Sequence, residues 1–491
     1  MKKKSTSYSQ ILKSTSIFGG SQVITIIIGI IRTKIIAVLL GTMGVGVIGI
    51  FQSIIDMMRS GAGLGMDTMS VRDMAYANSL PDKAELSKTV SLFNRWFLIT
   101  ALAGFLICII FCYPISVWAF GSGEYAIYIA LLSFSVFFAI LTVGRSTVLQ
   151  GMRHISDMAK SSIIGSFLGL LVTAPLYYFL GLDGITPAFL LVYLISFLCV
   201  QMYYRRLNIT KVKVSAKATI EGGIYIFKFS IYLFIAGVVA TGTMFLIKAL
   251  LVRNMNIDAA GLFQAAWTIS TIYLGLILRS MGSDFFPRLS AIANKKRGVR
   301  KLVNEQSYIV IIIASPLIVA MLFLSGQVIS ILYSSEFVNA DTVLRWQMFG
   351  TFLKVLSWPI AFIMLAKNKG LLFLITEALF YGVYILSCHL LFPTYGLDAT
   401  GIGYLIAYVV YLPIVYYIGW RIARFVWTGR VLRMTLVSLV LISFAFYVSQ
   451  YCEKHAILLG IISILTTLVY SIYNLKKVFS LQDLKNWFRK D

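Results

Sequence analysis

Four apolar segments of this chain each carry a stripe of polar and ionisable residues. Residues three, four and seven positions apart lie on one side of an α-helix, so each stripe predicts a polar helix face. The stripes are Gln22, Thr25, Gly29 and Arg32; Gln52, Asp56, Arg59 and Gly63; Gly237, Thr241 and Lys248; and Gln264, Thr268, Thr271, Gly275 and Arg279. Cations outnumber carboxylates in this set. Because an ionisable group inside a membrane normally faces water, a partner or a substrate path, the stripes predict one shared, hydrated, cationic cleft.

The chemistry of such a cleft points to an anionic ligand. Arginine binds phosphate through two parallel hydrogen bonds and stays charged at any relevant pH. We therefore predict a substrate that carries phosphate or carboxylate. The candidate substrate-binding residues are Arg32, Arg59, Lys248, Arg279, Gln52 and Gln264.

The carboxylates inside the apolar segments allow two interpretations. Asp56 and Glu377 are the acids that lie deep in these segments, and either is compatible with coupling to H⁺ or Na⁺. Alternatively they are partners in buried structural pairs. Asp56 and Arg59 are three residues apart and could neutralise each other, and Glu377 could pair with Lys354 or Arg345.

The elements that must position these residues are long apolar segments. Each is near the 20 residues that a helix needs to cross about 30 Å of hydrocarbon. The hydrophobic share of the chain is 59% and the charged share 13%. This pattern predicts an all-α polytopic membrane protein of about fourteen transmembrane helices. The predicted spans are 14–40, 44–66, 90–113, 124–149, 160–181, 185–204, 222–251, 259–286, 302–325, 340–365, 371–392, 398–420, 432–450 and 456–474.

The positions of the cations predict the orientation of the chain. The sequence holds 43 Lys and Arg and has a net charge of +24. Outside the spans, these residues lie at the two termini and in every second loop, and only Arg253 and Lys454 depart from this rule. By the positive-inside rule, both termini are then cytoplasmic. The charge reflects topology rather than nucleic-acid binding.

The sequence shows no pattern typical of an enzyme or an ATP-driven pump. The predicted loops are too short for a nucleotide-binding domain, and no phosphate-binding Gly-Lys-Ser/Thr loop is present. Neither the five cysteines nor the three histidines are spaced as metal ligands or as a disulfide framework. We therefore predict a protein that is not an enzyme and that uses no cofactor or metal.

A short repeat predicts two related halves. Gly49 to Gln52 reads Gly-Ile-Phe-Gln at the start of the second span, and Gly261 to Gln264 reads Gly-Leu-Phe-Gln at the start of the eighth. Six spans separate the two, so the halves would be parallel copies, as in transporters that work by alternating access. The predicted domains are a six-helix bundle at 1–204, a basic linker at 205–221, a second bundle at 222–420, and two additional helices with a basic tail at 421–491.

The chain resembles the O-antigen-type polysaccharide flippases of the multidrug/oligosaccharidyl-lipid/polysaccharide (MOP) exporter superfamily. The resemblance is carried by RTK at 32–34, LLGTMGVGVIGIFQ at 39–52 and MGSDFFPRLS at 281–290, together with the fourteen-span plan. It implies that Arg32, Arg59 and Arg279 occupy helices whose arginines bind substrate in related lipid II flippases.

The resemblance also implies a substrate and a setting. The substrate would be an oligosaccharide unit linked by diphosphate to undecaprenol, as in the biosynthesis of lipopolysaccharide O-antigen. It would pass from the cytoplasmic to the periplasmic leaflet of the bacterial inner membrane, and a polysaccharide polymerase and chain-length proteins would be partners. Two alternatives stay open from the sequence: a small-molecule or multidrug cation antiporter of the same superfamily, and a lipid II flippase.

Overall fold

The computed structural model describes the backbone of residues 2–80, 83–207, 209–210, 212, 214–451 and 456–477. The side chains of 2–21 and of some later residues, Arg279 among them, lie outside the described part. The predicted all-α class is confirmed, since the described chain is helical almost throughout and contains no strand. The chain divides into two compact units, which are considered separately below.

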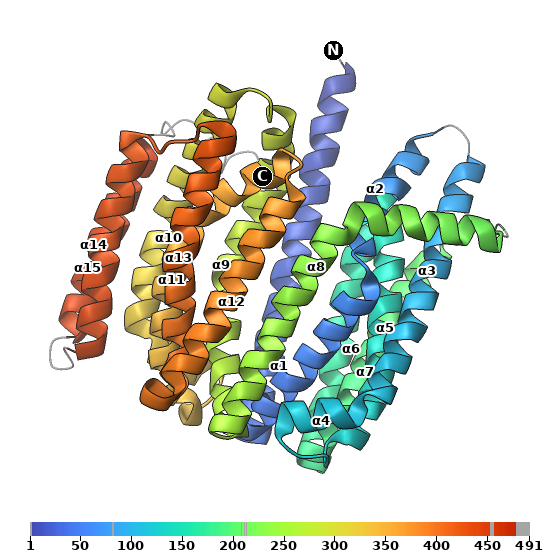
Figure 1. Ribbon diagram of the computed structural model, residues 1–491, viewed down its shortest axis with the longest axis horizontal. Helices are drawn as coiled ribbons and strands as arrows, with labels where there is room; N and C mark the ends of the chain where they lie inside the picture. Colours follow the sequence, from blue (N-terminus) through green and yellow to red (C-terminus); the bar gives the residue numbers. More distant parts are fainter. Residues whose placement is uncertain are drawn as a thin grey trace. The chain divides into compact units, whose positions relative to one another are not determined.

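The first unit comprises Met1–Gly261 and Leu332–Ser334. Its helices are α1 (Lys2–Gly63), α2 (Met66–Ser79), α3 (Lys83–Ile110), α4 (Cys112–Phe120), α5 (Ala126–Gly151), α6 (Ile155–Leu180), α7 (Ile185–Arg205) and α8 (Ala216–Asn254), with a short 3₁₀ turn η1 (Gly181–Gly184) before α7. Within this unit α5 packs against both α3 and α7, and α1 packs against α6 and α8 (Figure 1).

The second unit comprises Leu262–Ile331 and Ser335–Asp491. Its helices are α9 (Ile257–Ala291, whose first turn belongs to the first unit), α10 (Lys296–Leu332), α11 (Asp341–Ala366), α12 (Gly370–Tyr395), α13 (Ala399–Ala423), α14 (Gly429–Tyr451) and α15 (Ala456–Lys476); the 3₁₀ turns η2 (Ser335–Ala340) and η3 (Gly396–Asp398) precede α11 and α13. Helix α13 packs against both α11 and α12.

The described chain contains ten helical stretches that are long and apolar enough to cross a membrane. Three of them have 42, 51 and 54 residues and so are long enough to cross twice. Every predicted span lies on one of the observed helices, with α1 covering the first two. The total of fourteen crossings and the cytoplasmic location of the termini stay predictions.

A kink at Gly41 divides α1 at the boundary between the first two predicted spans. Gly41 has φ 62° and ψ −165°, a conformation essentially restricted to glycine because it lacks a Cβ. The kink separates an arm that carries Arg32 from an arm that carries Gln52, Asp56 and Arg59. The two polar stripes predicted for spans one and two therefore lie on two arms of one observed helix.

Close contact between α1 and the start of α9 fixes the kinked end of α1. A Cβ on Gly261 would overlap the carbonyl oxygen of Thr42, and a Cβ on Gly46 would overlap that of Ile257. The Thr42 hydroxyl donates to Asp258 Oδ1 at 2.5 Å. Gly261 opens the second copy of the sequence repeat, and Gly46 lies three residues before the first copy.

The compact units and the sequence repeat divide the chain at different points. By contacts, α8 belongs to the first unit because it packs along α1 and α4. By the repeat, the same helix opens the second half. The repeat indicates which segments are copies of each other, whereas the compact units reflect which segments are in contact. The domains at 1–204, 205–221, 222–420 and 421–491 stay a prediction.

Candidate functional site

The second arm of α1 presents a polar face to α7. Gln52 Nε2 donates to Asp56 Oδ2 at 3.1 Å and lies 3.1 Å from the hydroxyl of Tyr193. Tyr193 stands on α7 and stacks on Phe189 one turn earlier. The predicted stripe at Gln52 and Asp56 is thus an observed hydrogen-bonded face within the first unit.

Asp56 and Arg59 form an ion pair that leaves the arginine accessible. Arg59 Nη2 lies 3.4 Å from Asp56 Oδ1, the i, i+3 geometry that the sequence allows. The Arg59 side chain is nevertheless 47% exposed and the Asp56 side chain 33%. A half-exposed guanidinium keeps donors free for a ligand even though one of them faces the carboxylate.

Lys248 on α8 is the most enclosed of the candidate cations. Its side chain is 4% exposed, and Nζ donates to Ser53 Oγ at 2.7 Å and to the carbonyl oxygen of Gly49 at 2.8 Å. The ammonium also lies within electrostatic range of Asp56. Lys248 therefore connects α8 to α1 and brings its charge close to Asp56 from the buried side.

Arg32 brings a third positive charge to the same place. Arg32 lies beside Tyr177 on α6. Tyr193 is within electrostatic range of Arg32 and also of Asp56 and Arg59. Its Nε is buried and has no hydrogen-bond partner among the residues that the structure describes. An orphaned charged donor is costly in an apolar setting, so this atom is suited to an acceptor supplied by a ligand or water.

We call Arg32, Asp56, Arg59 and Lys248 the Asp56 cluster. It combines three cations with one carboxylate, and Asp67 adds a second carboxylate to the cavity beside Arg59, so cations still outnumber acids among these described residues. The glycines of α1 and α8 widen this cavity. Its lining is Arg59, Ser60, Gly63, Gly65, Asp67, Phe97, Ile140, Val143, Leu233, Phe234 and Gly237.

The candidates in the second unit are less completely described. Gln264 Nε2 donates to Thr268 Oγ1 at 3.0 Å, one turn along the predicted stripe of α9. The Gln264 Oε1 atom is buried and has no partner among the described residues. Arg279 lies on α9, and its side chain is outside the described part.

Glu377 lies in a cluster of tyrosines on α12 and α13. Its Oε1 accepts a hydrogen bond from Tyr411 at 2.7 Å, and Lys354 is within electrostatic range. Tyr381 and Tyr408 are close to the carboxylate as well. Of the two cations that the sequence offers as partners, Lys354 is the one near Glu377.

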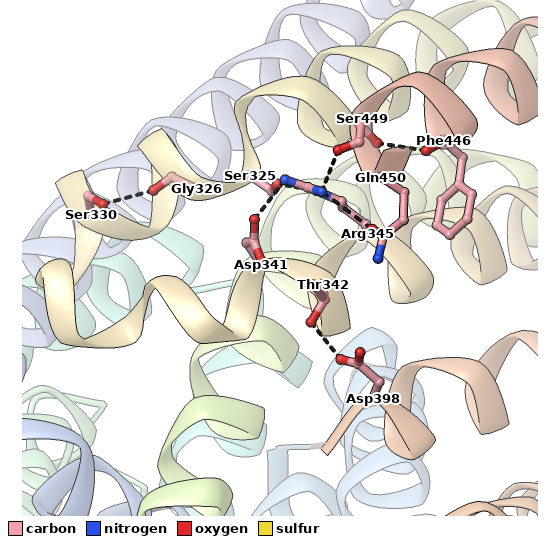
Figure 2. Close-up of polar contacts among 10 residues, drawn as sticks. All are labelled: Ser325, Gly326, Ser330, Asp341, Thr342, Arg345, Asp398, Phe446, Ser449 and Gln450. Atoms are coloured by element: carbon pink, nitrogen blue, oxygen red, sulfur yellow. Dashed lines mark hydrogen bonds and ion pairs between the residues drawn. The ribbon is translucent and has the colours of Figure 1, made fainter. Parts of the chain in front are cut away.

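Arg345 shows how a span cation appears when its role is structural (Figure 2). Its guanidinium donates to Asp341 at 2.7 Å, to the Ser449 carbonyl at 2.6 Å and to Ser325 Oγ at 3.1 Å, which joins α11 to α14 and α10. Gln450 accepts a further hydrogen bond at 3.3 Å. Every donor nitrogen of this guanidinium has a protein partner, in contrast to Arg32.

The tyrosines of this site cannot be predicted from the sequence. Tyr177 and Tyr193 come from α6 and α7, which carry no ionisable stripe, and tyrosines are common throughout the chain. No spacing marks these two residues. The packing of α6 against α1 brings Tyr177 to the Asp56 cluster, and a hydrogen bond from Gln52 joins Tyr193 of α7 to it.

Comparison with known proteins places the chain in a family. Residues 35–341, well over half of the chain, match the family described as polysaccharide biosynthesis protein. The chain belongs to this family. It is also 23% identical over 392 residues to the lipid III flippase of Escherichia coli K12, covering 79% of this chain and 92% of that protein.

The fold of the chain is shared with MOP-superfamily transporters, as the resemblance predicts. The lipid II flippase MurJ in an inward closed conformation matches 94% of this chain and 99% of its own, with a TM-score of 0.72 and 17% identity. An inward-facing multidrug resistance MATE transporter matches 82% of this chain and 96% of its own, with a TM-score of 0.66 and 16% identity. The fold is thus common to flippases and drug transporters, and the site must distinguish them.

Proposed function

We propose that this protein flips a lipid-linked oligosaccharide across the bacterial inner membrane. The substrate is a polysaccharide repeat unit joined by diphosphate to undecaprenol, and it moves from the cytoplasmic to the periplasmic leaflet by alternating access. The observation that carries the proposal is the Asp56 cluster, in which three cations face one carboxylate. The family and the E. coli lipid III flippase support the same class of substrate.

The diphosphate is the group that suits the cluster. A guanidinium forms two parallel hydrogen bonds to phosphate oxygens, so Arg32 and Arg59 are the residues we assign to direct contact. Lys248 already donates to Gly49 and Ser53, so we assign it an electrostatic contribution from its buried position rather than direct contact with the diphosphate. Gln52 supplies a neutral donor on the same face. Arg279 and Gln264 are the further binding residues that the stripes predict from the second unit.

The membrane potential can supply the driving force. A diphosphate diester carries about two negative charges, and moving them outward across about 100 mV releases roughly 4–5 kcal/mol. This gain requires that the protein cations do not travel with the lipid. Coupling to H⁺ or Na⁺ through Asp56 or Glu377 is the alternative source of energy.

A multidrug antiporter is the principal competing function. Organic cations bind best beside uncompensated carboxylates, whereas the Asp56 cluster has the opposite balance of charge. A lipid II flippase differs from our proposal only in the glycan, since both substrates share the undecaprenyl diphosphate. The Asp56 cluster would bind the diphosphate that both substrates share. Transport of lipids with different glycans must therefore be compared to distinguish the two functions.

The test is transport by the purified chain in proteoliposomes without ATP. A fluorescent undecaprenyl-diphosphate oligosaccharide is placed in one leaflet, and its arrival in the other leaflet is followed under an imposed potential or pH gradient. Protein-dependent flipping supports the proposal. Failure to move any of several glycans, including that of lipid II, together with uptake of a small organic cation, would assign the chain to the drug antiporters.

A further inference from the structure

A second cationic pocket lies in the first unit, away from the Asp56 cluster. It is formed by α3, α5 and the segment that precedes α8, and its volume is about 550 Å³. Its lining is Ser91, Asn94, Arg95, Leu98, Leu141, Arg145, Val212 and Val214. None of these residues belongs to the predicted substrate site. Of its described lining residues, two are arginines and none is an acid.

Neutral groups hold the guanidinium of Arg145 in place. Arg145 Nε donates to Gln201 Oε1 at 2.7 Å, and its Nη1 donates to Asn94 Oδ1. The guanidinium lies 4.6 Å above the ring of Tyr204, whose hydroxyl accepts from Asn94 at 2.8 Å. Neutral partners fix the orientation of the side chain without cancelling its charge.

Arg95 is held in a similar way on the adjacent helix. Its Nη1 donates to the carbonyl oxygen of Val214 at 2.7 Å and to Thr219 Oγ1 at 3.1 Å. Among the residues that the structure describes, neither Arg95 nor Arg145 forms an ion pair. The pocket therefore presents two oriented positive charges for which no described acidic side chain forms an ion pair.

An apolar track leads away from the pocket along α3. Leu98, Leu102, Leu106 and Ile110 follow one another at four-residue intervals and are all exposed, from 45% at Leu98 to 67% at Ile110. Residues four apart lie on one helix face, so they form a continuous stripe that begins at the pocket. In a membrane protein such an exposed stripe contacts acyl chains.

We propose that this pocket binds the phosphodiester headgroup of an anionic bilayer phospholipid. Arg95 and Arg145 bind the phosphate oxygens, and an acyl chain lies along Leu98 and the stripe below it. Basic pockets between transmembrane helices at the cytoplasmic surface bind anionic headgroups in this manner. The charge pattern of the sequence places this end of α3 at that surface. The carrier-lipid diphosphate has similar chemistry, but the pocket opens onto the lipid-facing stripe of α3, which favours a bulk phospholipid.

The site has a structural consequence for the segment before α8. Arg95 contacts the Val214 carbonyl, and Trp96 Nε1 donates to the carbonyl of Thr219 at 2.8 Å. A bound headgroup would share Arg95 with this segment. Phospholipid binding should therefore stabilise the attachment of the basic linker to α3.

Native mass spectrometry of the full-length purified protein tests the site. The protein is incubated with phosphatidylglycerol, with phosphatidylcholine, or with farnesyl diphosphate as a soluble polyprenyl diphosphate. We compare wild type with Arg95→Gln, Arg145→Gln and the double variant. Arg205→Gln is the matched control, because Arg205 is exposed near the same end of the unit but does not line the pocket.

The proposal predicts selective retention of phosphatidylglycerol over phosphatidylcholine. Each cation near an anionic headgroup is worth about 1 kcal/mol, so each single Gln variant should bind about fivefold more weakly and the double variant about 25-fold. Arg205→Gln should bind as wild type does. If Arg145→Gln does not fold, Arg95→Gln still tests the proposal, because Arg95 is exposed and its replacement should not prevent folding.

Three results would overturn the proposal. Equal retention of the two phospholipids would show that the pocket does not recognise an anion. Unchanged phosphatidylglycerol binding in folded Arg95→Gln would place the lipid elsewhere. Displacement of phosphatidylglycerol by farnesyl diphosphate, lost in the same variants, would assign the pocket to the carrier lipid instead.

Discussion

At the scale of single residues, the cations of the spans differ in how far protein atoms satisfy them. Arg345 has a partner for every donor nitrogen, and Lys248 is enclosed by Ser53 and Gly49. Arg59 is half exposed, and Arg32 has a buried nitrogen without a described partner. Binding to a ligand is therefore assigned to Arg32 and Arg59, and positioning to Lys248.

Replacing Arg59 tests direct binding. Hydrogen bonds to charged groups contribute about 1.5–3 kcal/mol, so Arg59→Gln should weaken binding of a polyprenyl diphosphate about 10- to 100-fold. Arg59→Lys should lose less affinity, because lysine keeps the positive charge although it cannot form the two parallel hydrogen bonds of arginine. Both variants should fold, since the side chain is half exposed. Isothermal titration would measure the affinities, and an unchanged affinity in Arg59→Gln would remove this residue from the site.

Replacing Lys248 tests the contact between α8 and α1. Lys248→Met removes the two hydrogen bonds that the ammonium donates to Ser53 Oγ and to the Gly49 carbonyl, and only the bond from the Ser53 hydroxyl to the Gly49 carbonyl remains. Thermal unfolding in detergent should show a loss of about 1–3 kcal/mol. Ser53→Ala is the control, because it removes one partner and leaves the ammonium bonded to Gly49; its loss should be smaller. A Lys248→Met protein as stable as wild type would show that this lysine is not structural.

At the scale of helices, hydropathy and spacing were sufficient to predict the elements. Each predicted span falls on an observed helix because a spanning segment must satisfy its own backbone polar groups, which makes length and apolarity informative. The polar stripes predicted the faces of the helices that carry ionisable residues, because charge inside an apolar segment is costly and is placed where it has a partner or water. Helices α2 and α4 are not among the predicted spans, because α2 is too polar and α4 too short to cross a membrane.

Partners across helices could not be predicted in the same way. The contact of Gln52 with Tyr193 joins residues 141 positions apart, and no periodicity along one helix encodes it. The proximity of Asp56 to Arg59 was predictable because both lie on one helix. The exposure of Arg59 depends on the cavity beside it, which is built from α1, α2, α3, α5 and α8.

The glycine contact at the kinked end of α1 gives a prediction at this scale. Gly261→Ala would place a methyl group against the Thr42 carbonyl, so backbone must move, and such overpacking costs about 1–3 kcal/mol. Gly382→Ala is the matched control, because its Cβ meets open space on α12. Alanine otherwise favours a helix, so the control should be neutral or stabilising. Equal melting temperatures for the two variants would contradict the close contact.

At the scale of the whole molecule, the charge of +24 and the polarity of the site serve different purposes. Most cations lie at the termini and in alternate predicted loops, where the positive-inside rule predicts that they set orientation and where we expect them to attract anionic lipid. The few inside the helices are the ones that we propose to select the ligand. The same fold in drug transporters shows that the helices alone do not decide the substrate.

The proposed charge of the substrate predicts a dependence on membrane potential. With the inside negative, outward movement of about two negative charges is favourable, so a potassium diffusion potential of that sign should accelerate flipping. Reversal of the potential should slow it. A rate that ignores the potential but follows an imposed pH or Na⁺ gradient would instead assign the energy to ion coupling through Asp56 or Glu377.

The most direct test of the central claim compares flipping of the same undecaprenyl-diphosphate oligosaccharide by wild type and by Arg32→Gln/Arg59→Gln. Both proteins are reconstituted at equal density after their melting temperatures and their insertion have been matched. The cationic-cluster account predicts that the wild type flips the lipid and that the double variant loses at least about 100-fold in rate, from two charge-assisted contacts of about 1.5–3 kcal/mol each. Flipping at the wild-type rate by a folded double variant would contradict the account, because the substrate would then cross without the charges proposed to bind it.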